Sequence, residues 1–313
     1  VKKIWNTYPS LISFNSADLV FKIAPRINAA GRLAHAKIAV EFLLSADGDE
    51  KSVFSDIESL NKNRKSLDED ITKEALFQLS KTPATRFTNV VYSPNWHKGV
   101  IGIVASRVIE DFYKPTIVFS GDGDLITGSA RSVKEFDIYD ILNQLKHYFI
   151  RFGGHKYAAG LTMKREILDD FSKDFEKLVA DNMSEEVRQK KISIDVDLTL
   201  EKLFQNLNKN GVPKLMRIIK QMEPFGPSNP RPVFCFKKLY FKSPPRIVGQ
   251  KHIKFLFTDS QQAKHIGGIW FNSAEKLQKI NQLEKADIVG SVVENYYNNQ
   301  MSLQLNIKDV KPS

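Results

Sequence analysis

Three short segments of the sequence combine arginine, serine or histidine with small residues, a combination suited to holding phosphate. The first, residues 24–32, reads Ala-Pro-Arg-Ile-Asn-Ala-Ala-Gly-Arg, so that Arg26 and Arg32 flank Asn28. A guanidinium fork matches two phosphate oxygens at once, and small residues let a ligand approach closely. A loop whose arginines pair with nearby acids would have the same composition, so this segment alone leaves both interpretations open.

The second segment follows a predicted strand and carries Ser129, Arg131 and Ser132. Two hydroxyls and a guanidinium at the end of a strand are able to grip one phosphate group. Serine-rich strand ends are common in proteins, so this pattern is not specific by itself.

The third segment contains Gly153, Gly154 and His155. Paired glycines allow positive φ and a close approach of the backbone to a ligand. A histidine beside them can donate to a phosphate or serve as an acid or base near neutral pH. A glycine turn with an incidental histidine explains the same residues, and the alternative stays open.

The two later segments lie within residues 86–186, where predicted strands and helices alternate. We expect strands at 89–92, 116–119, 125–130 and 160–163, and helices at 100–112, 138–148 and 168–182. Alternation of this kind predicts a sheet covered by helices, an α/β domain. Residues 121–124, Gly-Asp-Gly-Asp, are expected to form a turn.

Residues 1–85 are expected to form the end of one domain and a helix that connects it to the next domain. Apolar residues between 53 and 79 recur at three-, four- and seven-residue steps, which predicts one long connecting helix within 49–85. Residues 1–48 contain amphipathic stretches but are too few to form a core of their own. We therefore expect them to be the end of a domain that continues upstream of residue 1.

The last part of the chain, residues 187–313, is strongly basic and rich in predicted strands. It holds 21 Lys and Arg against 10 Asp and Glu, a net charge of +11, whereas residues 1–186 hold 25 against 26, a net charge of −1. Such a charge distribution is typical of a module that binds a polyanion. Short strands expected at 192–196, 233–241, 253–257, 265–271, 286–293 and 302–307 indicate a small all-β barrel of the OB type.

Aromatic and cationic residues interleave in this basic domain, as they do in proteins that bind single strands. The residues expected to contact a strand are Lys237, Lys238, Tyr240, Lys242, Arg246, Lys251, Lys254 and Trp270. Because side chains alternate between the two faces of a strand, we expect at least half of the aromatic residues here to be core.

The composition excludes several other classes of protein. No apolar run reaches the roughly 20 residues that a membrane-spanning helix needs, and the first residues lack the features of a signal peptide. Cys235 is the only cysteine, which excludes an internal disulfide and a cysteine-based zinc site. We expect a buried Cys235, a cytoplasmic setting and a monomer.

Together the three segments resemble the RecJ branch of the DHH phosphoesterase superfamily, in which they occur in this order. The resemblance covers residues 18–313 and adds a Trp-His-x-Gly-Val-x-Gly-Ile-Val-Ala-Ser-Arg segment at 96–107. It implies the end of a DHH catalytic domain, a connecting helix, a DHH-associated domain and an OB-like domain. A departure is Ala130, where relatives often have glycine, and this raises the prospect of a slightly tighter pocket.

The resemblance implies a single-strand-specific 5′→3′ exodeoxyribonuclease that uses Mn²⁺ or Mg²⁺. It implies phosphate contacts for Ser129, Arg131 and His155, and a strand path along Arg26 and Arg32. No Asp-His-His occurs here, so we expect no metal site in these residues, metal ligands upstream of residue 1, and no nuclease activity from this chain alone. Implied partners are single-stranded DNA, a single-strand-binding protein and a helicase. A non-catalytic strand-binding protein and a phosphodiesterase of short oligonucleotides remain alternatives.

Overall fold

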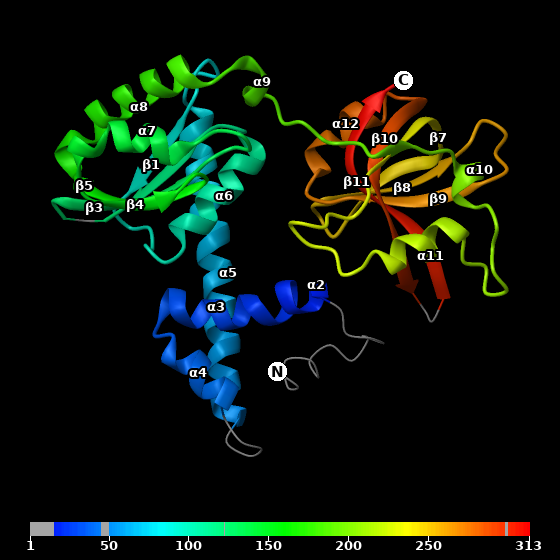
Figure 1. Cartoon of the computed structure of the whole chain (residues 1–313), viewed down its shortest axis with the longest axis horizontal. Helices are drawn as coiled ribbons and strands as arrows, with labels where there is room; N and C mark the ends of the chain where they lie inside the picture. The colour runs from blue at the N-terminus through cyan, green and yellow to red at the C-terminus, as the bar shows by residue number, and fades with distance from the viewer. Residues whose placement is uncertain (1–15, 45–49, 122, 298–299) are drawn as a thin grey trace. The chain divides into compact units, whose positions relative to one another are not determined.

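The computed structural model describes residues 16–44, 50–121, 123–297 and 300–313 of the chain. It divides into two compact units, Val1–Lys190 and Lys191–Ser313, which are drawn together in Figure 1. Each unit is described by itself below. Among the described helices, none is long and apolar enough to cross a membrane.

Unit 1 begins with short helices packed against one long helix, α5, Glu50–Ser80 (Figure 1). The helical spacing predicted within residues 49–85 is therefore confirmed. Buried positions on α5 recur with that spacing at Ile57, Ile71, Ala75 and Leu79. The short elements are α2 (Ser16–Asp18), a π-helix (Leu19–Ile23), α3 (Ala24–Leu33) and α4 (Lys37–Leu44).

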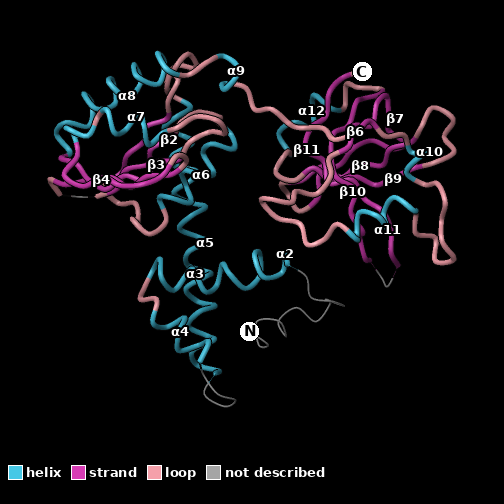
Figure 2. Tube along the Cα trace, in the orientation of Figure 1, coloured by secondary structure: helices cyan, strands magenta, loops and turns pink. Residues whose placement is uncertain are grey.

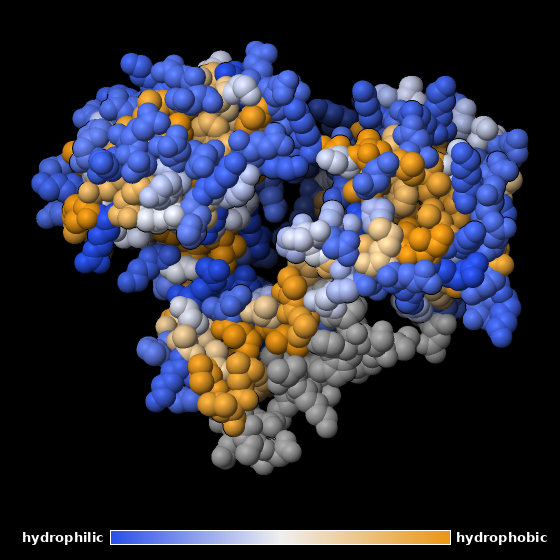
Figure 3. Space-filling model, in the orientation of Figure 1, coloured by the Kyte–Doolittle hydropathy of each residue, from blue (hydrophilic) through white to orange (hydrophobic). Residues whose placement is uncertain are grey.

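Apolar side chains remain exposed at this end of unit 1, where Figure 3 shows a hydrophobic surface over the first helices. The exposed residues are Leu19, Val20, Phe21, Val40, Leu43 and Leu44. Among the described residues, the large apolar side chains buried here are Ile23, Phe42 and Ile57, together with the small residues Ala29, Ala30 and Ala39. The exposed apolar residues lie around this small cluster.

The rest of unit 1 is a five-stranded sheet with helices on both faces. The strands are β1 (Asn89–Ser93), β2 (Thr116–Ser120), β3 (Leu125–Arg131), β4 (Phe149–His155) and β5 (Ala158–Lys164), in the order β1-β2-β3-β5-β4. β1 and β2 are parallel, and the other pairs are antiparallel. The predicted α/β architecture is confirmed.

Helices α7 (Ile138–Gln144) and α8 (Leu168–Asn182) cover one face of the sheet, as Figure 2 shows. Phe119, Phe171 and Phe175 are fully buried in that layer. Helix α6, Ile101–Asp111, packs on the other face against β2 and β3, and α5 packs against α6 and β1. Side chains of β4 and β5 on that second face are left exposed or half-buried.

The glycine-rich third segment is a strand, which the sequence interpretation missed. We expected a helix over 138–148 and assigned no strand to residues 149–155, but α7 ends at Gln144 and β4 pairs with β5 across a tight turn. Neither Gly153 nor Gly154 has a positive φ. The close approach is real at Gly154, where an added Cβ would lie 2.5 Å from the carbonyl oxygen of Ala158.

Unit 2 is a barrel of five strands, which confirms the predicted OB-type domain. The strands are β7 (Phe234–Val248), β8 (His252–Thr258), β9 (His265–Trp270), β10 (Lys285–Tyr297) and β11 (Gln300–Pro312). They run in the order β7-β8-β9-β11-β10, and β10 pairs with β7 to close the barrel. Helix α12, Leu277–Ile280, connects β9 to β10.

Shorter elements lead into the barrel, and two differ from expectation. The strand expected at 192–196 is only β6, Val196–Asp197, and helix α11, Lys214–Gln221, was not predicted. α11 is amphipathic and buries Met216 and Ile219 in the barrel core. Two further short helices are α9 (Glu185–Arg188), near the end of unit 1, and α10 (Leu200–Leu203), which precedes the barrel strands. Cys235 is buried in β7, as expected.

Candidate nucleic-acid interface

The open face of unit 1 is a three-by-three grid of side chains on β3, β5 and β4. Residues paired across a sheet point to the same face. The pairing therefore places nine residues together in three rows: Arg131–Ala158–His155, Ser129–Gly160–Gly153 and Thr127–Thr162–Arg151. We call this surface the open face.

Two glycines, Gly160 and Gly153, lie side by side at the centre of the open face, and we call them the glycine floor. A Cβ added at Gly153 or Gly160 would meet nothing within 4 Å, and neither glycine has a positive φ. Protein packing and backbone conformation therefore do not explain these two glycines. Their absent side chains leave room above the sheet for something that is not part of unit 1.

Arg131 and Ser129 lie on β3 along one side of the glycine floor, and we call them the polar wall. Arg131 Nη1 donates to Ser129 Oγ at 3.1 Å and to the carbonyl oxygen of Ala130 at 2.8 Å. Within the described part of the chain, Arg131 has no carboxylate partner. Burial lowers the pKa of Arg131 from its ordinary value, and the like charge of Arg32 lowers it further. An anion at this wall would relieve both costs.

The first turn of α6 supports the wall from one side. A Cβ added at Gly102 would lie 3.0 Å from Arg131 Nη2 and 3.0 Å from Ser129 Oγ, so only glycine leaves these side chains in place. The beginning of a helix carries partial positive charge, which adds to the attraction for an anion.

Arg32 reaches the same region from α3. Its Nη1 donates to the carbonyl oxygen of Gly99 at 3.3 Å, and a Cβ on Gly99 would collide with the carbonyl oxygen of Arg32. His97 Nδ1 accepts from the Gly99 amide at 3.0 Å and so helps to hold this loop. The segment at 96–107 thus joins the first and second phosphate-binding segments.

One buried carboxylate serves two further arginines nearby. Asp68 on α5 is fully buried and lies 2.7 Å from Arg107 Nη2 and 3.7 Å from Arg64 Nη1. The charge of Arg32 acts on Arg64 as well as on Arg131. Arg64 and Arg107 thus share one carboxylate within the protein, whereas Arg32 and Arg131 are not paired with this acid.

Four expected contacts lie elsewhere in unit 1. Arg26 is buried, forms an ion pair with Glu58 and donates to the carbonyl oxygen of Lys22 at 2.6 Å, which is the local pairing that the sequence left open. Ser132 Oγ donates to the carbonyl oxygen of Phe136 at 2.8 Å and holds a turn. Gly154 faces the sheet interior. Asn28 is exposed on α3.

Arg151 belongs to the open face but was missed. Its row partner is Thr162, and its side chain is exposed. The signal was the alternation of Arg151, Gly153 and His155, which share one face of a strand. We had assigned the preceding residues to a helix, and that hid the period of two.

Unit 2 brings some of the expected contacts together on the outside of the barrel. Arg246, Lys254, Ile269 and Asn306 form one row across four strands. The two cations of this row are exposed and lie on adjacent strands. A positive row beside an apolar side chain suits the backbone and a base of a single strand.

Other expected contacts of unit 2 lie on different surfaces. Lys237, Lys238 and Tyr240 line a groove of about 470 Å³ with Lys264, and Lys237 is bound to Asp197 at 2.6 Å. Lys242 and Lys251 are exposed, on β7 and in the turn that follows it.

The expectation of a stacking ring at Trp270 needs correction, because the ring is in the barrel core. Trp270 is only 7% exposed and pairs with Ile253, which is fully buried. Lys276 Nζ lies 4.4 Å from the centroid of its ring. We therefore omit Trp270 from the proposed contacts.

The described residues contain no group of three or more His, Cys, Asp or Glu side chains that could hold a metal ion. The residues present therefore do not fit the metal centre that the family resemblance implies, and no chemical step is derived through a metal. What the geometry supplies is a cationic, open surface on an α/β domain and a basic barrel, the class of protein that handles nucleic-acid strands.

Comparisons with known proteins agree with this class. A model of the DHHA1 domain matches residues 86–181, and a model of the RecJ OB domain matches residues 194–309. The single-stranded-DNA-specific exonuclease RecJ of Haemophilus influenzae is 31% identical over 312 residues, covering 96% of this chain and 52% of that protein. RecJ of Bacillus subtilis is 30% identical over 308 residues, covering 96% of this chain and 37% of that protein. The chain belongs to the RecJ family.

A solved structure supports the fold. RecJ from Thermus thermophilus, crystallised with Mn²⁺, superposes with a TM-score of 0.80 at 24% identity, covering 98% of this chain and 43% of that one. The chain thus spans about half the length, or less, of the relatives that it matches.

Proposed function

We propose that this chain positions the 5′-phosphorylated end of single-stranded DNA for hydrolysis in a 5′→3′ exonuclease. The open face holds the terminal phosphate and nucleotide, and the outer row of the barrel holds the strand. The divalent metals and their ligands belong to a part of the enzyme outside these 313 residues. Membership of the RecJ family and the titles of its relatives support the substrate class.

The observation that carries the proposal is that Arg131, which has no carboxylate partner among the described residues, lies beside the glycine floor. Arg131 is half-buried and is fixed by Ser129 and a backbone carbonyl, next to the two glycines whose side-chain positions are empty. A buried cation without a counter-charge is costly unless a ligand supplies that charge. His155 closes the same row about 10 Å away, at two strand spacings of roughly 4.8 Å. That space suits a phosphate and its sugar.

The test compares strands that differ only at their 5′ end. Fluorescence anisotropy would measure the affinity of the chain for a 5′-phosphorylated and a 5′-hydroxyl oligonucleotide. We expect the phosphorylated strand to bind at least tenfold more tightly, and Arg131→Gln to remove most of that difference. Lys177→Gln, which removes an exposed charge from α8, is the control and should preserve it. Equal affinities for both strands in the unmodified chain would refute the proposal.

A second measurement tests where the metals belong. The chain incubated with Mn²⁺ and labelled single-stranded DNA should release no nucleotides, because the described residues hold no metal-binding group. Metal-dependent release would show that the catalytic centre lies within this chain. Affinity that falls as the strand is shortened would separate this proposal from a phosphodiesterase of short oligonucleotides, which needs only a short substrate.

A further inference from the structure

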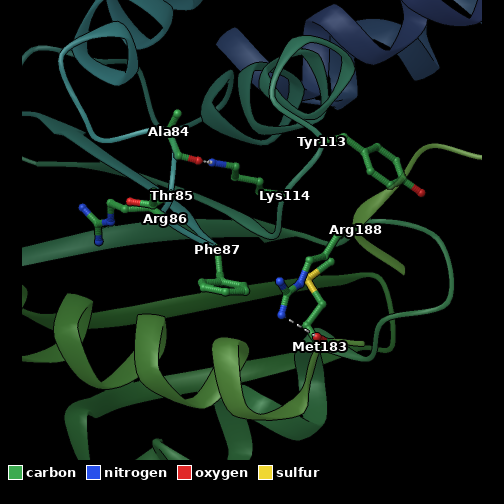
Figure 4. Close-up of a pocket in the computed structure, with 8 residues that line it drawn as sticks. All are labelled: Ala84, Thr85, Arg86, Phe87, Tyr113, Lys114, Met183 and Arg188. Atoms are coloured by element: carbon green, nitrogen blue, oxygen red, sulfur yellow. Dashed lines mark hydrogen bonds between the residues drawn. The ribbon is translucent and has the colours of Figure 1, made fainter. Parts of the chain in front are cut away.

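A second concave site lies in unit 1, away from the open face. It is a pocket of about 200 Å³ where the ends of three helices meet the start of β1 (Figure 4). The residues that line it follow α5, α6 and α8: Ala84, Thr85, Arg86, Phe87, Tyr113, Lys114, Met183 and Arg188. None of these residues belongs to the open face, and none is among the residues proposed above to contact the strand.

The pocket is lined by three cations, Arg86, Lys114 and Arg188, and the Glu176 carboxylate beside it is bound to the protein. Glu176 accepts from the amides of Phe87 at 2.7 Å and Thr88 at 3.0 Å, and also lies 3.6 Å from Arg86 Nε. Lys114 Nζ donates to the carbonyl oxygen of Ala84 at 3.1 Å. Burial lowers the pKa of Lys114, Glu176 opposes this shift, and Arg86 adds to it. Glu176 forms its ion pair with Arg86, while Lys114 and Arg188 donate to backbone carbonyl oxygens.

The wall beside Arg86 and Lys114 is a flat stack of a guanidinium on an aromatic ring. The Arg188 guanidinium lies over the ring of Phe87, 4.1 Å from its centroid, and Arg188 Nη2 donates to the carbonyl oxygen of Met183 at 3.2 Å. Figure 4 shows Phe87, Arg188 and Met183 clustered together, with Tyr113 and Lys114 across from them. Stacked guanidinium and aromatic planes are surfaces on which nucleobases stack.

We propose that this pocket binds a nucleoside monophosphate unit, with the phosphate held by Lys114 and the base stacked on the Arg188 guanidinium that covers Phe87. A ligand with both an anionic group and a flat ring uses the lysine and this stacked wall together. The choice of a nucleotide among aromatic anions rests on the proposed function. The unit has two sources, a free nucleotide or one nucleotide within a strand.

The experiment measures the binding of labelled dAMP to the whole chain by equilibrium dialysis. The Arg131→Gln background removes the proposed open-face site, so that only the pocket remains. In this background we expect one equivalent of dAMP to bind, and Arg188→Gln or Lys114→Gln to weaken it at least tenfold. Lys177→Gln is the matched charge-removal control and should leave it unchanged. Arg188 is exposed, so its substitution preserves the fold even if loss of the Lys114 bond does not.

The outcomes separate the two sites. Loss of all dAMP binding in Arg131→Gln alone would overturn the pocket and leave the open face standing. Binding unchanged by Arg131→Gln but lost in Arg188→Gln would support the pocket and count against the open face. Inorganic phosphate that binds as tightly as dAMP would overturn the role of the base. In the Arg131→Gln background, competition by an oligonucleotide would assign the site to a strand, and its absence would assign it to a released nucleotide.

Discussion

The glycine floor of the open face predicts a substitution that weakens binding without harming the fold. Gly160 is the central residue of the grid, between Ser129 and Gly153, and an added Cβ there meets nothing within 4 Å. Valine suits a strand better than glycine, so Gly160→Val should leave the free energy of unfolding unchanged or raise it by about 0.5–1 kcal/mol. The same side chain fills the space proposed for the terminal nucleotide.

The expected loss of affinity is set by how completely the floor is blocked. A valine at the centre would displace the ligand from Arg131, and loss of one charge-assisted contact costs about 1.5–3 kcal/mol. That range corresponds to a decrease of roughly tenfold or more in affinity for a 5′-phosphorylated strand. Anisotropy with that strand and urea denaturation of the same samples would measure the two effects.

The neighbouring glycine provides the opposite control. A Cβ on Gly154 would lie 2.5 Å from the carbonyl oxygen of Ala158 and 2.6 Å from the Cβ of Ala159. Gly154→Ala should therefore lower the free energy of unfolding by about 1–3 kcal/mol through overpacking. If Gly160→Val bound the phosphorylated strand as well as the unmodified chain does, the floor would not be the contact surface and the reasoning would fail.

Three other substitutions test the remaining assignments. Trp270→Ala should lower the free energy of unfolding by about 3–5 kcal/mol, measured in urea, because its ring is core; an unaltered stability with lost strand binding would contradict this. Replacing Arg246 and Lys254 together with glutamine should reduce the slope of log affinity against log salt by about 1.4, at about 0.7 for each phosphate contact, whereas an unchanged slope would exclude the barrel row. Arg26→Gln should cost about 1.5–3 kcal/mol of stability through its lost bond to Glu58, with strand affinity per folded molecule retained.

The sequence predicted the helices whose apolar residues recur at regular spacing. It did not predict strand β4, whose conformation depends on its pairing with β5. The long helix expected within 49–85 is Glu50–Ser80, and the last helix of the α/β domain is Leu168–Asn182, as predicted. Both have apolar residues at regular helical spacing. β4 was missed because Phe149 and its neighbours follow a helix without a glycine or proline to mark the boundary. Only the pairing with β5 decides that conformation.

The direction in which side chains point was harder to predict than the elements. Gly153 and Gly154 are adjacent, yet one lies on an open surface and the other faces packed backbone. The same ambiguity misplaced Trp270, since a strand of a closed barrel has one inward face and the sequence does not say which. Ser129 and Arg131, which we propose to bind phosphate, were predicted correctly as neighbours because they are two apart on one strand.

The arginines around the open face differ in how their charges are balanced, and this difference supports the proposal that an external anion binds there. Asp68 is the fully buried acid of this region, and its charge is shared between Arg64 and Arg107. Arg32 and Arg131 repel each other and are held by a backbone carbonyl and by a hydroxyl with a carbonyl, respectively. A structure-only role would be served by an uncharged donor without the cost of desolvating a guanidinium. Under the proposed function a bound phosphate supplies the missing counter-charge, so its binding should raise the free energy of unfolding of unit 1.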